Sequence, residues 1–300
     1  MVLAGGTGGA KLAAGMQAIL PPGALTVIAN PGDDLDLWGL RICPDLDSVI
    51  YHLAGIFDAE RGFGVAGDTF AAHAMMGRLG EPDWFWLGDR DLGVHLLRTR
   101  LLGQGMRPSQ VALELGRRLG VPSRVVPATD DPVRTHFLTD AGRLSFQEYF
   151  VRHRLEPRLR SIEFDGLEKA RPSPEAREAL VAADLVVIGP SNPLISIEPI
   201  LNVLGPPGRQ EVTVAVTPIV GGRALKGPTV EMMAAVGLDP TPVGVARRYQ
   251  KWARWYVLDA LDQGDAGRIE ALGLQVVVAD TVMAGIEGAK RLALRLVGMG

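Results

Sequence analysis

A run of aspartates early in the chain is the densest group of chemically active side chains in the sequence. Five of them fall within fifteen positions, at Asp33, Asp34, Asp36, Asp45 and Asp47. Carboxylates that converge on one site repel one another and raise one another's pKa. A hard divalent cation such as Mg²⁺ relieves this cost and takes carboxylate oxygens as ligands. The run therefore predicts a metal site, although helix capping or ordinary turns would explain one or two of its members.

A glycine-rich segment, Gly5–Leu12, follows the first short apolar run and opens a helical pattern. Glycines allow backbone N–H groups to approach a phosphate, and a helix N-terminus adds partial positive charge. The P-loop pattern fails because Lys11 is followed by Leu12 rather than by Ser or Thr, and the dinucleotide pattern lacks its third glycine. We expect a phosphate- or nucleotide-binding turn, with a purely structural strand-to-helix turn as the alternative.

Three further groups offer polar side chains in or beside turns. Arg90 has the guanidinium that suits phosphate, carboxylate or a flat ring, although it could simply pair with Asp89. Ser191 and Asn192 follow an apolar run, and Thr217–Pro228 repeats that arrangement after the next one. Ligands of open α/β sheets bind at the carboxyl ends of strands, so these turns lie where a ligand would. Proline-defined turns without a ligand are the alternative reading.

Short apolar runs alternate with longer helical patterns, which is typical of a parallel sheet covered by helices on both faces. The expected strands are Met1–Ala4, Leu25–Ala29, Arg124–Val126, Asp184–Ile188, Val212–Val216 and Val276–Val278. The expected helices are Ala10–Leu20, Ser48–Gly55, Phe70–Leu79, Leu92–Leu102, Pro108–Leu119, Pro174–Ala183, Thr229–Val236 and Ile286–Val297. This pattern predicts an α/β fold: a three-layer αβα, Rossmann-like, mainly parallel sheet.

Residues 130–172 break the alternation. Apolar runs at Thr135–Leu138 and Leu144–Phe150 flank an Asp-Ala-Gly turn, which predicts a hairpin, and Arg158–Phe164 adds a further strand. We interpret this region as a small β-containing insertion or lid. A second unusual stretch, residues 247–256, interleaves cations and aromatics, a pattern that a nucleic-acid surface also shows. Because the whole chain is acidic, we interpret this stretch as a solvated amphipathic helix.

Composition limits the classes of function. The 300 residues are 47% hydrophobic and 22% charged with a formal charge of −3, which favours one globular α/β domain over residues 1–300 and no nucleic-acid or membrane partner. One cysteine, Cys43, excludes an internal disulfide. The first residues lack the pattern of a secretory signal, so we expect a cytoplasmic protein.

Taken together and in order, these motifs resemble the 2-phospho-L-lactate transferase family, which acts in the biosynthesis of the deazaflavin coenzyme F-420. The resemblance covers nearly the whole chain and rests on the order of the motifs Gly5–Leu12, Gly32-Asp33-Asp34, Pro44-Asp45-Leu46-Asp47, Gly88–Leu92, Phe146–Phe150, Gly189–Pro193 and Thr217–Pro228.

The resemblance implies a transferase and its substrates. A phospholactate or phosphoenolpyruvate group would pass from a guanosine-diphosphate-linked donor to the terminal ribityl hydroxyl of the deazaflavin alcohol Fo, and GMP would leave. The family requires Mg²⁺, and its members suggest a homodimer. Phosphoryl transfer depends mainly on positioning and charge neutralisation, so the absence of a nucleophilic triad is no objection.

Carried over by position, the resemblance assigns roles to individual residues. Contact with Fo falls to Asp47 and Arg90, and catalytic roles fall to Asp47 and Asp34. Mg²⁺ would be held by a set drawn from Asp33, Asp34, Asp45 and Asp47. The donor's phosphates or guanosine would be held by Gly6, Gly8, Gly9, Ser191 and Asn192. Two departures from relatives, Ser48 in place of threonine and the Asn30-Pro31 pair, remove no ligand.

Two other classes of protein compete with the transferase. A non-catalytic nucleotide-sugar-binding regulator of the YvcK-like type shares the fold, but has no need for an Fo pocket. An NAD(P)-dependent oxidoreductase would use Asp33 for the ribose hydroxyls, but the missing third glycine and the aspartate run speak against it. The sequence leaves open whether the donor carries lactate or enolpyruvate.

Overall fold

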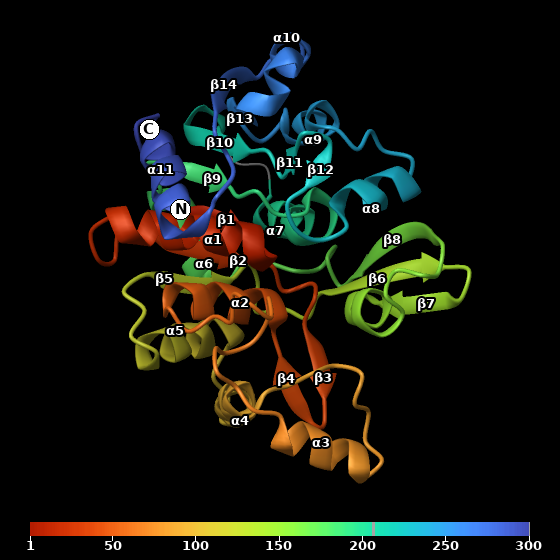
Figure 1. Cartoon of the computed structure of the whole chain (residues 1–300). Helices are drawn as coiled ribbons and strands as arrows, with labels where there is room; N and C mark the ends of the chain where they lie inside the picture. The colour runs from red at the N-terminus through yellow and green to blue at the C-terminus, as the bar shows by residue number, and fades with distance from the viewer. Residues whose placement is uncertain (206–207, 300) are drawn as a thin grey trace.

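The computed structural model describes residues 1–205 and 208–299. Its centre is a seven-stranded, wholly parallel sheet in the order β14-β13-β10-β9-β1-β2-β5 (Figure 1). The strands are β1 (Val2–Ala4), β2 (Thr26–Ala29), β5 (Arg124–Pro127), β9 (Val186–Ile188), β10 (Thr213–Val216), β13 (Trp255–Asp259) and β14 (Gln275–Ala279). The predicted α/β class with a parallel sheet is confirmed.

Each central strand buries side chains on both faces, as its continuous apolar sequence predicts. In β1, Val2 and Ala4 belong to one hydrophobic cluster and Leu3 to the other, because successive side chains of a strand point to opposite faces. The first cluster includes side chains of α1 (Gly6–Ile19), α2 (Pro44–Leu53), α5 (Pro108–Arg118) and α11 (Gly285–Val297). The second includes those of α6 (Pro174–Ala182), α7 (Glu198–Leu204), α8 (Thr229–Ala235), α9 (Pro242–Tyr249) and α10 (Ala266–Glu270).

The order of the strands reverses between β1 and β9. From β1 the chain adds β2 and β5 on one side of the sheet, then returns to place β9, β10, β13 and β14 on the other. At such a switch point the loops after two neighbouring strands diverge and leave a crevice at their carboxyl ends. The glycine-rich turn after β1 and the Ser191 turn after β9 therefore face each other.

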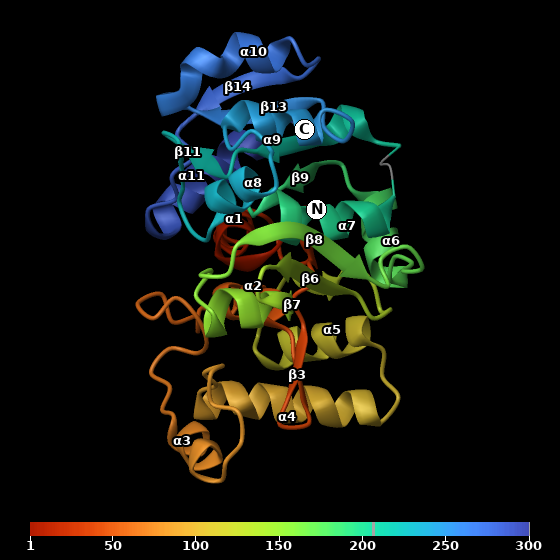
Figure 2. The ribbon, with the colours of Figure 1, turned by 90° about the vertical axis from the view of Figure 1, so that its right-hand side faces the viewer.

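Smaller elements lie outside the main sheet. The hairpin β3 (Leu35–Leu37) and β4 (Leu40–Ile42), with α3 (Ala71–Arg78) and α4 (Asp89–Gly103), extends beyond the β5 edge of the sheet (Figure 2). A separate antiparallel sheet, β7-β6-β8, lies to the right of the main sheet in Figure 1; it consists of β6 (Arg134–Thr139), β7 (Gly142–Ser145) and β8 (Leu159–Asp165). The hairpin β11 (Ile219–Val220) and β12 (Arg223–Ala224) follows β10.

Three local expectations are wrong. Residues 247–256 are the end of α9 followed by a turn and the start of β13, so aromatic Trp255 and Tyr256 form a strand rather than one face of a helix. The second arm of the expected hairpin ends at Ser145, and a short helical segment, η1 (Glu148–Arg152), follows. The aspartate run contains the β3–β4 hairpin rather than a plain loop.

Within the described residues, no helix is both long and apolar enough to span a bilayer.

Candidate functional site

The glycine-rich turn after β1 is packed tightly against the turn after β9. The hydroxyl of Ser191 accepts hydrogen bonds from the backbone N–H groups of Gly5 and Gly9, both at 3.2 Å. A Cβ on Gly8 would lie 2.2 Å from the carbonyl oxygen of Pro190, so any side chain there would force the turns apart. Close packing across the switch point therefore accounts for part of the glycine pattern.

The first turn of α1 keeps donors for a ligand. The N–H of Gly6 bonds Asp45, and that of Gly9 bonds Ser191. The N–H groups of Thr7 and Gly8 have no partner in the described part of the chain. Asn192 points elsewhere: its Oδ1 accepts from Leu194 N at 2.9 Å and so caps the following segment. Two backbone donors at a helix N-terminus remain available to a phosphate.

Asp33 and Asp45 form a buried acidic pair beside this turn. Asn30 holds Asp45 by an Nδ2–Oδ2 hydrogen bond of 3.0 Å. Burial raises the pKa of Asp45 to about 6, although the bonds from Asn30 and Gly6 oppose the shift. Burial and the charge of Asp45 raise the pKa of Asp33 well above its usual range. Asp33 Oδ1 is buried and has no hydrogen-bond partner among the residues described.

The carboxylate oxygen of Asp33 that lacks a hydrogen-bond partner favours a cation-binding site here. No set of three or more His, Cys, Asp or Glu side chains in residues 1–205 and 208–299 is arranged as a ready-made metal site. Mg²⁺, however, is usually held by one or two carboxylates and completes its shell with waters and substrate phosphates. Asp33 and Asp45, beside free backbone donors for a phosphate, fit that donor set.

Asp34, next to Asp33 in the chain, lines a neighbouring cleft. Its Oδ2 accepts a hydrogen bond from the thiol of Cys43 at 3.2 Å. Burial raises the pKa of Asp34 to about 7, although the nearby positive charges of Arg134 and Arg41 oppose the shift. The four aspartates predicted to bind a metal therefore do not form one cluster. Asp33 and Asp45 form the acidic pair, and Asp34 lies between this pair and the cleft.

Asp47 is engaged in a buried ion pair. Its Oδ2 accepts from Nη1 of Arg98 at 3.0 Å, and its Oδ1 accepts from Nη2. Burial alone would lower the pKa of Arg98, but the charge of Asp47 holds it above its usual value. Arg98 is 2% exposed, and it also lines the cleft. Asp47 therefore meets this cleft through Arg98, and its predicted roles toward metal and Fo stay predictions.

A chain of buried polar groups continues from Arg98 along α4. Nη1 of Arg98 lies 3.0 Å from Nδ1 of His95, and Arg98 can only donate. The imidazole proton is therefore on Nε2, which lies 3.2 Å from Oδ1 of Asp91. Tyr51 donates its hydroxyl proton to that same oxygen. These contacts fix the spacing between α2 and α4.

Arg90 precedes Asp91 but points outward. Its side chain is exposed, and Nη1 donates to the carbonyl oxygen of Ala66 at 3.0 Å. Arg90 is not among the residues that line the cleft, and it does not pair with Asp89. Its predicted contact with Fo stays a prediction.

Two aspartates cap each other's helices around Arg90. Asp68, which precedes α3, accepts from the N–H groups of Arg90 (2.8 Å) and Asp91 (3.1 Å) at the start of α4. Asp89, in the first turn of α4, accepts from the N–H groups of Ala71 and Ala72 at the start of α3. Each carboxylate thus satisfies helical donors that would otherwise lack a partner.

We expect Asp68→Ala to lower the free energy of unfolding by about 1–2 kcal/mol, because the first turn of α4 loses its cap. Denaturant unfolding followed by circular dichroism measures the change. Glu81→Ala, at an exposed position beyond α3, is the matched control and should change the stability by less than about 0.5 kcal/mol. An equal loss in both variants would contradict the capping role of Asp68.

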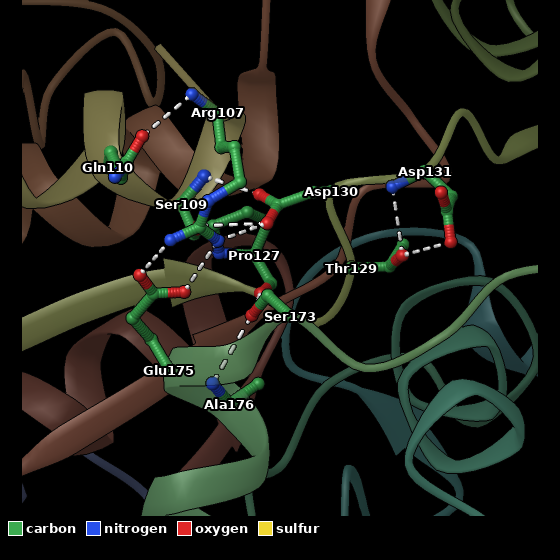
Figure 3. A network of polar contacts seen from close by, with 10 residues as sticks. All are labelled: Arg107, Ser109, Gln110, Pro127, Thr129, Asp130, Asp131, Ser173, Glu175 and Ala176. Atoms are coloured by element: carbon green, nitrogen blue, oxygen red, sulfur yellow. Dashed lines mark hydrogen bonds and ion pairs between the residues drawn. The ribbon is translucent and has the colours of Figure 1, made fainter.

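The cleft that Asp34 lines has a volume of about 300 Å³. It opens at the carboxyl ends of β2 and β5, between α2, α4 and α5. Its wall on the β5 side is braced by the polar network of Figure 3. There Arg107 pairs with Glu175 and Asp130 at 2.6 Å each, and Asp130 also accepts from the N–H of Ser109 at 2.7 Å. This network ties α5, α6 and the loop after β5 together beside the cleft.

Two lysines, Lys11 of α1 and Lys226 of the loop after β12, carry positive charge in this part of the chain. Burial lowers the pKa of His52 to about 4, and the charges of both lysines contribute to that shift. Neither lysine has an ion-pair partner within residues 1–205 and 208–299. A cation at the start of α1 and one from the loop after β12 are therefore available to an anionic ligand.

Part of this site was not predicted from the sequence. Arg98 was not among the predicted residues, although Asp91, His95 and Arg98 are spaced so that they share one face of α4. Nor was Arg134, whose role depends on how the β7-β6-β8 sheet is placed, or Lys226, which lay within the noted Thr217–Pro228 segment. For Arg134 no local sequence signal exists.

Comparison with known proteins gives concordant matches. The family model described as 2-phospho-L-lactate transferase CofD matches residues 1–282. A 2-phospho-L-lactate transferase of Methanosarcina barkeri is 37% identical over 301 residues, covering 100% of this chain and 97% of that protein. A phosphoenolpyruvate transferase of Streptomyces griseus is 37% identical and covers 98% of this chain and 95% of its own length.

A solved structure also resembles this chain. The crystal structure of a UPF0052-family protein from Bacillus halodurans has a TM-score of 0.62 and covers 99% of this chain and 97% of its own. At 16% sequence identity, this likeness shows a shared fold alone.

Proposed function

Because the chain belongs to the 2-phospho-L-lactate transferase CofD family, we propose that it catalyses the transfer step of coenzyme F-420 biosynthesis. The donor is guanosine diphosphate whose terminal phosphate is esterified to lactate or to enolpyruvate. The terminal ribityl hydroxyl of Fo attacks the phosphorus that bears the three-carbon acid. A new P–O bond forms to Fo, the P–O bond to GMP breaks, and the hydroxyl proton passes to a carboxylate.

The observation that carries this proposal is that two backbone N–H groups able to bind a phosphate lie beside a buried acidic pair. The N–H groups of Thr7 and Gly8 are free at the start of α1, and Asp45 contacts the same turn through Gly6. Lys11 of the same helix, α1, carries a further positive charge. A diphosphate bound here would have its charge neutralised from several sides, which is the main requirement of phosphoryl transfer.

Mg²⁺ fits this proposal on the residues present. Asp33 and Asp45 would hold it, and when bound it supplies positive charge that neutralises the phosphate oxygens. Asp34, with a pKa near 7, is matched to accepting the hydroxyl proton at neutral pH. Asp47 acts on the acceptor side of the site through Arg98, and Arg90 is proposed for the outer part of the acceptor.

A binding titration with Fo, followed by its fluorescence, tests the proposal. We expect saturable binding that strengthens when Mg²⁺ and GDP are added, since both substrates share one edge of the sheet. A transferase assay with the lactate and the enolpyruvate donor then identifies the three-carbon acid, because relatives named for each were found. Absence of Fo binding under every condition, together with absence of GMP release, would refute the proposal.

The alternative of a nucleotide-sugar-binding regulator is not favoured by the family match. A homodimer is a further part of the proposal, because it follows from the resemblance to the family. Light scattering of the purified protein would test it.

A further inference from the structure

A threonine from outside the aspartate run, Thr135 of β6, lies against the buried acidic pair. Burial and the charge of Asp45 raise the pKa of Asp33, and the nearby hydroxyl of Thr135 opposes that rise. The same hydroxyl oxygen would lie 2.6 Å from a Cβ on Gly32, the residue before Asp33. The side chain of Thr135 is therefore in contact with the loop that carries Asp33.

The backbone of β6 is fixed to this loop at the same point. The N–H of Thr135 donates to the carbonyl oxygen of Gly32 at 2.7 Å. Next to it in the chain, Nη2 of Arg134 lies 3.6 Å from Oδ2 of Asp36. The β7-β6-β8 sheet thus meets the aspartate run through the first two residues of β6. A side chain from a separate sheet is held beside the acidic pair.

The hydroxyl of Thr135 is buried without a partner. Thr135 is 2% exposed, and its Oγ1 makes no hydrogen bond in the part of the chain that the structure describes. Thr139, on the same buried face of β6, differs: its hydroxyl donates to the carbonyl oxygen of Gly142 at 2.8 Å and accepts from the N–H of Ala141 at 3.1 Å. An unpaired buried hydroxyl costs free energy, and valine has a similar shape without that cost. Packing alone therefore does not explain threonine at position 135.

Asp33 and Thr135 each carry a buried oxygen that lacks a hydrogen-bond partner, Oδ1 and Oγ1 respectively, although the two side chains are neighbours. A water molecule would satisfy the hydroxyl but would leave the charges of Asp33 and Asp45 opposed. A divalent cation satisfies both requirements, because it neutralises the carboxylates and accepts a neutral oxygen as a further ligand. Threonine and serine hydroxyls serve Mg²⁺ in this way in phosphate-binding loops.

We propose that Thr135 belongs to the cation site, with its hydroxyl oxygen as a third protein ligand beside the carboxylates of Asp33 and Asp45. This inference rests on the Mg²⁺ site of the function proposed above and adds a ligand from a different sheet. It also explains Gly32, because a Cβ at this position would displace the hydroxyl. Binding of the ion and docking of the β7-β6-β8 sheet against the aspartate run are then coupled.

The first test removes the hydroxyl. Titration calorimetry with Mg²⁺ alone, on chelator-treated protein at pH 8, measures the affinity without any substrate. Thr135→Val is expected to weaken Mg²⁺ binding by about tenfold or more, the loss typical of altering a side chain around a metal. Thr135→Ser keeps the hydroxyl and should restore most of the affinity. Thr139→Val is the matched control, since Thr139 is buried on the same face of β6 but bonds within its own hairpin, and it should bind Mg²⁺ as the wild type does.

The second test leaves Thr135 in place and displaces its hydroxyl. Gly32→Ala is expected to weaken Mg²⁺ binding about as much as Thr135→Val, because the new Cβ would lie 2.6 Å from Oγ1. Gly93→Ala is the control: Gly93 is in α4, and a Cβ there would meet no atom within 4 Å. Thermal melts report folding of every variant. If Thr135→Val fails to fold, the Gly32 and Gly93 pair decides.

Three results would overturn the assignment. They are wild-type Mg²⁺ affinity in folded Thr135→Val, an equal loss of affinity in Thr139→Val, and absence of Mg²⁺ binding by the wild type. Failure of the proposed function is seen in different measurements, the binding of Fo and the release of GMP. A wild-type protein that releases GMP while Thr135→Val binds Mg²⁺ normally would refute the role of Thr135 alone.

Discussion

Replacing Arg98 with methionine is expected to lower the free energy of unfolding by about 3–5 kcal/mol, the loss typical of breaking a buried ion pair from one side. Asp47 would lose the guanidinium that it contacts, at a site where its side chain is only 6% exposed. His95, whose Nδ1 lies 3.7 Å from Asp47, offers one ring nitrogen in place of the two-nitrogen contact of the guanidinium. Denaturant unfolding at pH 7.5 measures this loss.

The double variant Arg98→Met, Asp47→Leu separates the ion pair from its unpaired remnant. We expect it to recover most of the lost stability, since replacing a buried ion pair by apolar side chains of similar volume is often close to neutral. Transferase activity should nevertheless stay absent, because Asp47 is proposed for the acceptor side of the site. A double variant as unstable as Arg98→Met would contradict this account, and one that is stable and active would remove Asp47 from the mechanism.

Asp45→Asn should stabilise the metal-free protein at pH 8 while abolishing activity. The pKa of Asp45 is raised from about 4 in the unfolded chain to about 6 in the fold, so between these values the folded state binds more protons. The contribution of Asp45 to stability is therefore most favourable below about pH 4. It declines as the pH rises, and the decline is complete above about pH 6. Asparagine removes that loss but keeps an acceptor for Asn30 Nδ2.

The expected gain is on the order of 3 kcal/mol at pH 8 and close to zero at pH 4, since the pKa is raised by about two units and one unit corresponds to about 1.4 kcal/mol. Thermal melts at both pH values, in buffer with chelator, measure it. Asp83→Asn, at an exposed position, is the control and should show no such pH dependence. Mg²⁺ should raise the melting temperature of the wild type at pH 8 but not that of Asp45→Asn. A variant destabilised at pH 8 would contradict the unfavourable burial of this carboxylate.

The strands of the main sheet could be predicted from the sequence wherever they are apolar throughout. Leu25–Ala29 and Val212–Val216 are buried on both faces, so their composition alone marked them. β13 was missed because Trp255 and Tyr256 follow a cationic stretch whose pattern resembles an amphipathic helix. The β3–β4 hairpin was missed because its strands have three residues each and contain charged side chains.

The candidate site was predictable only where its residues follow a strand. Asp33 and Ser191 lie at strand ends, and the topology brings such positions to one edge of the sheet. The partners that decide how each side chain is used come from distant segments: Arg98 claims Asp47, and Cys43 and Arg134 turn Asp34 toward the cleft. The spacing of residues within one segment does not predict such pairing between distant segments.

The exchange of caps between Asp68 and Asp89 has a consequence for how this part of the protein opens. Neither helix start is satisfied unless the other is in place, so α3 and α4 should come apart as one cooperative unit. In native-state hydrogen exchange, the amides of Ala72 and Asp91 would then show the same opening free energy. Arg90 is carried by this unit, so its presentation to solvent depends on whether both helices are closed.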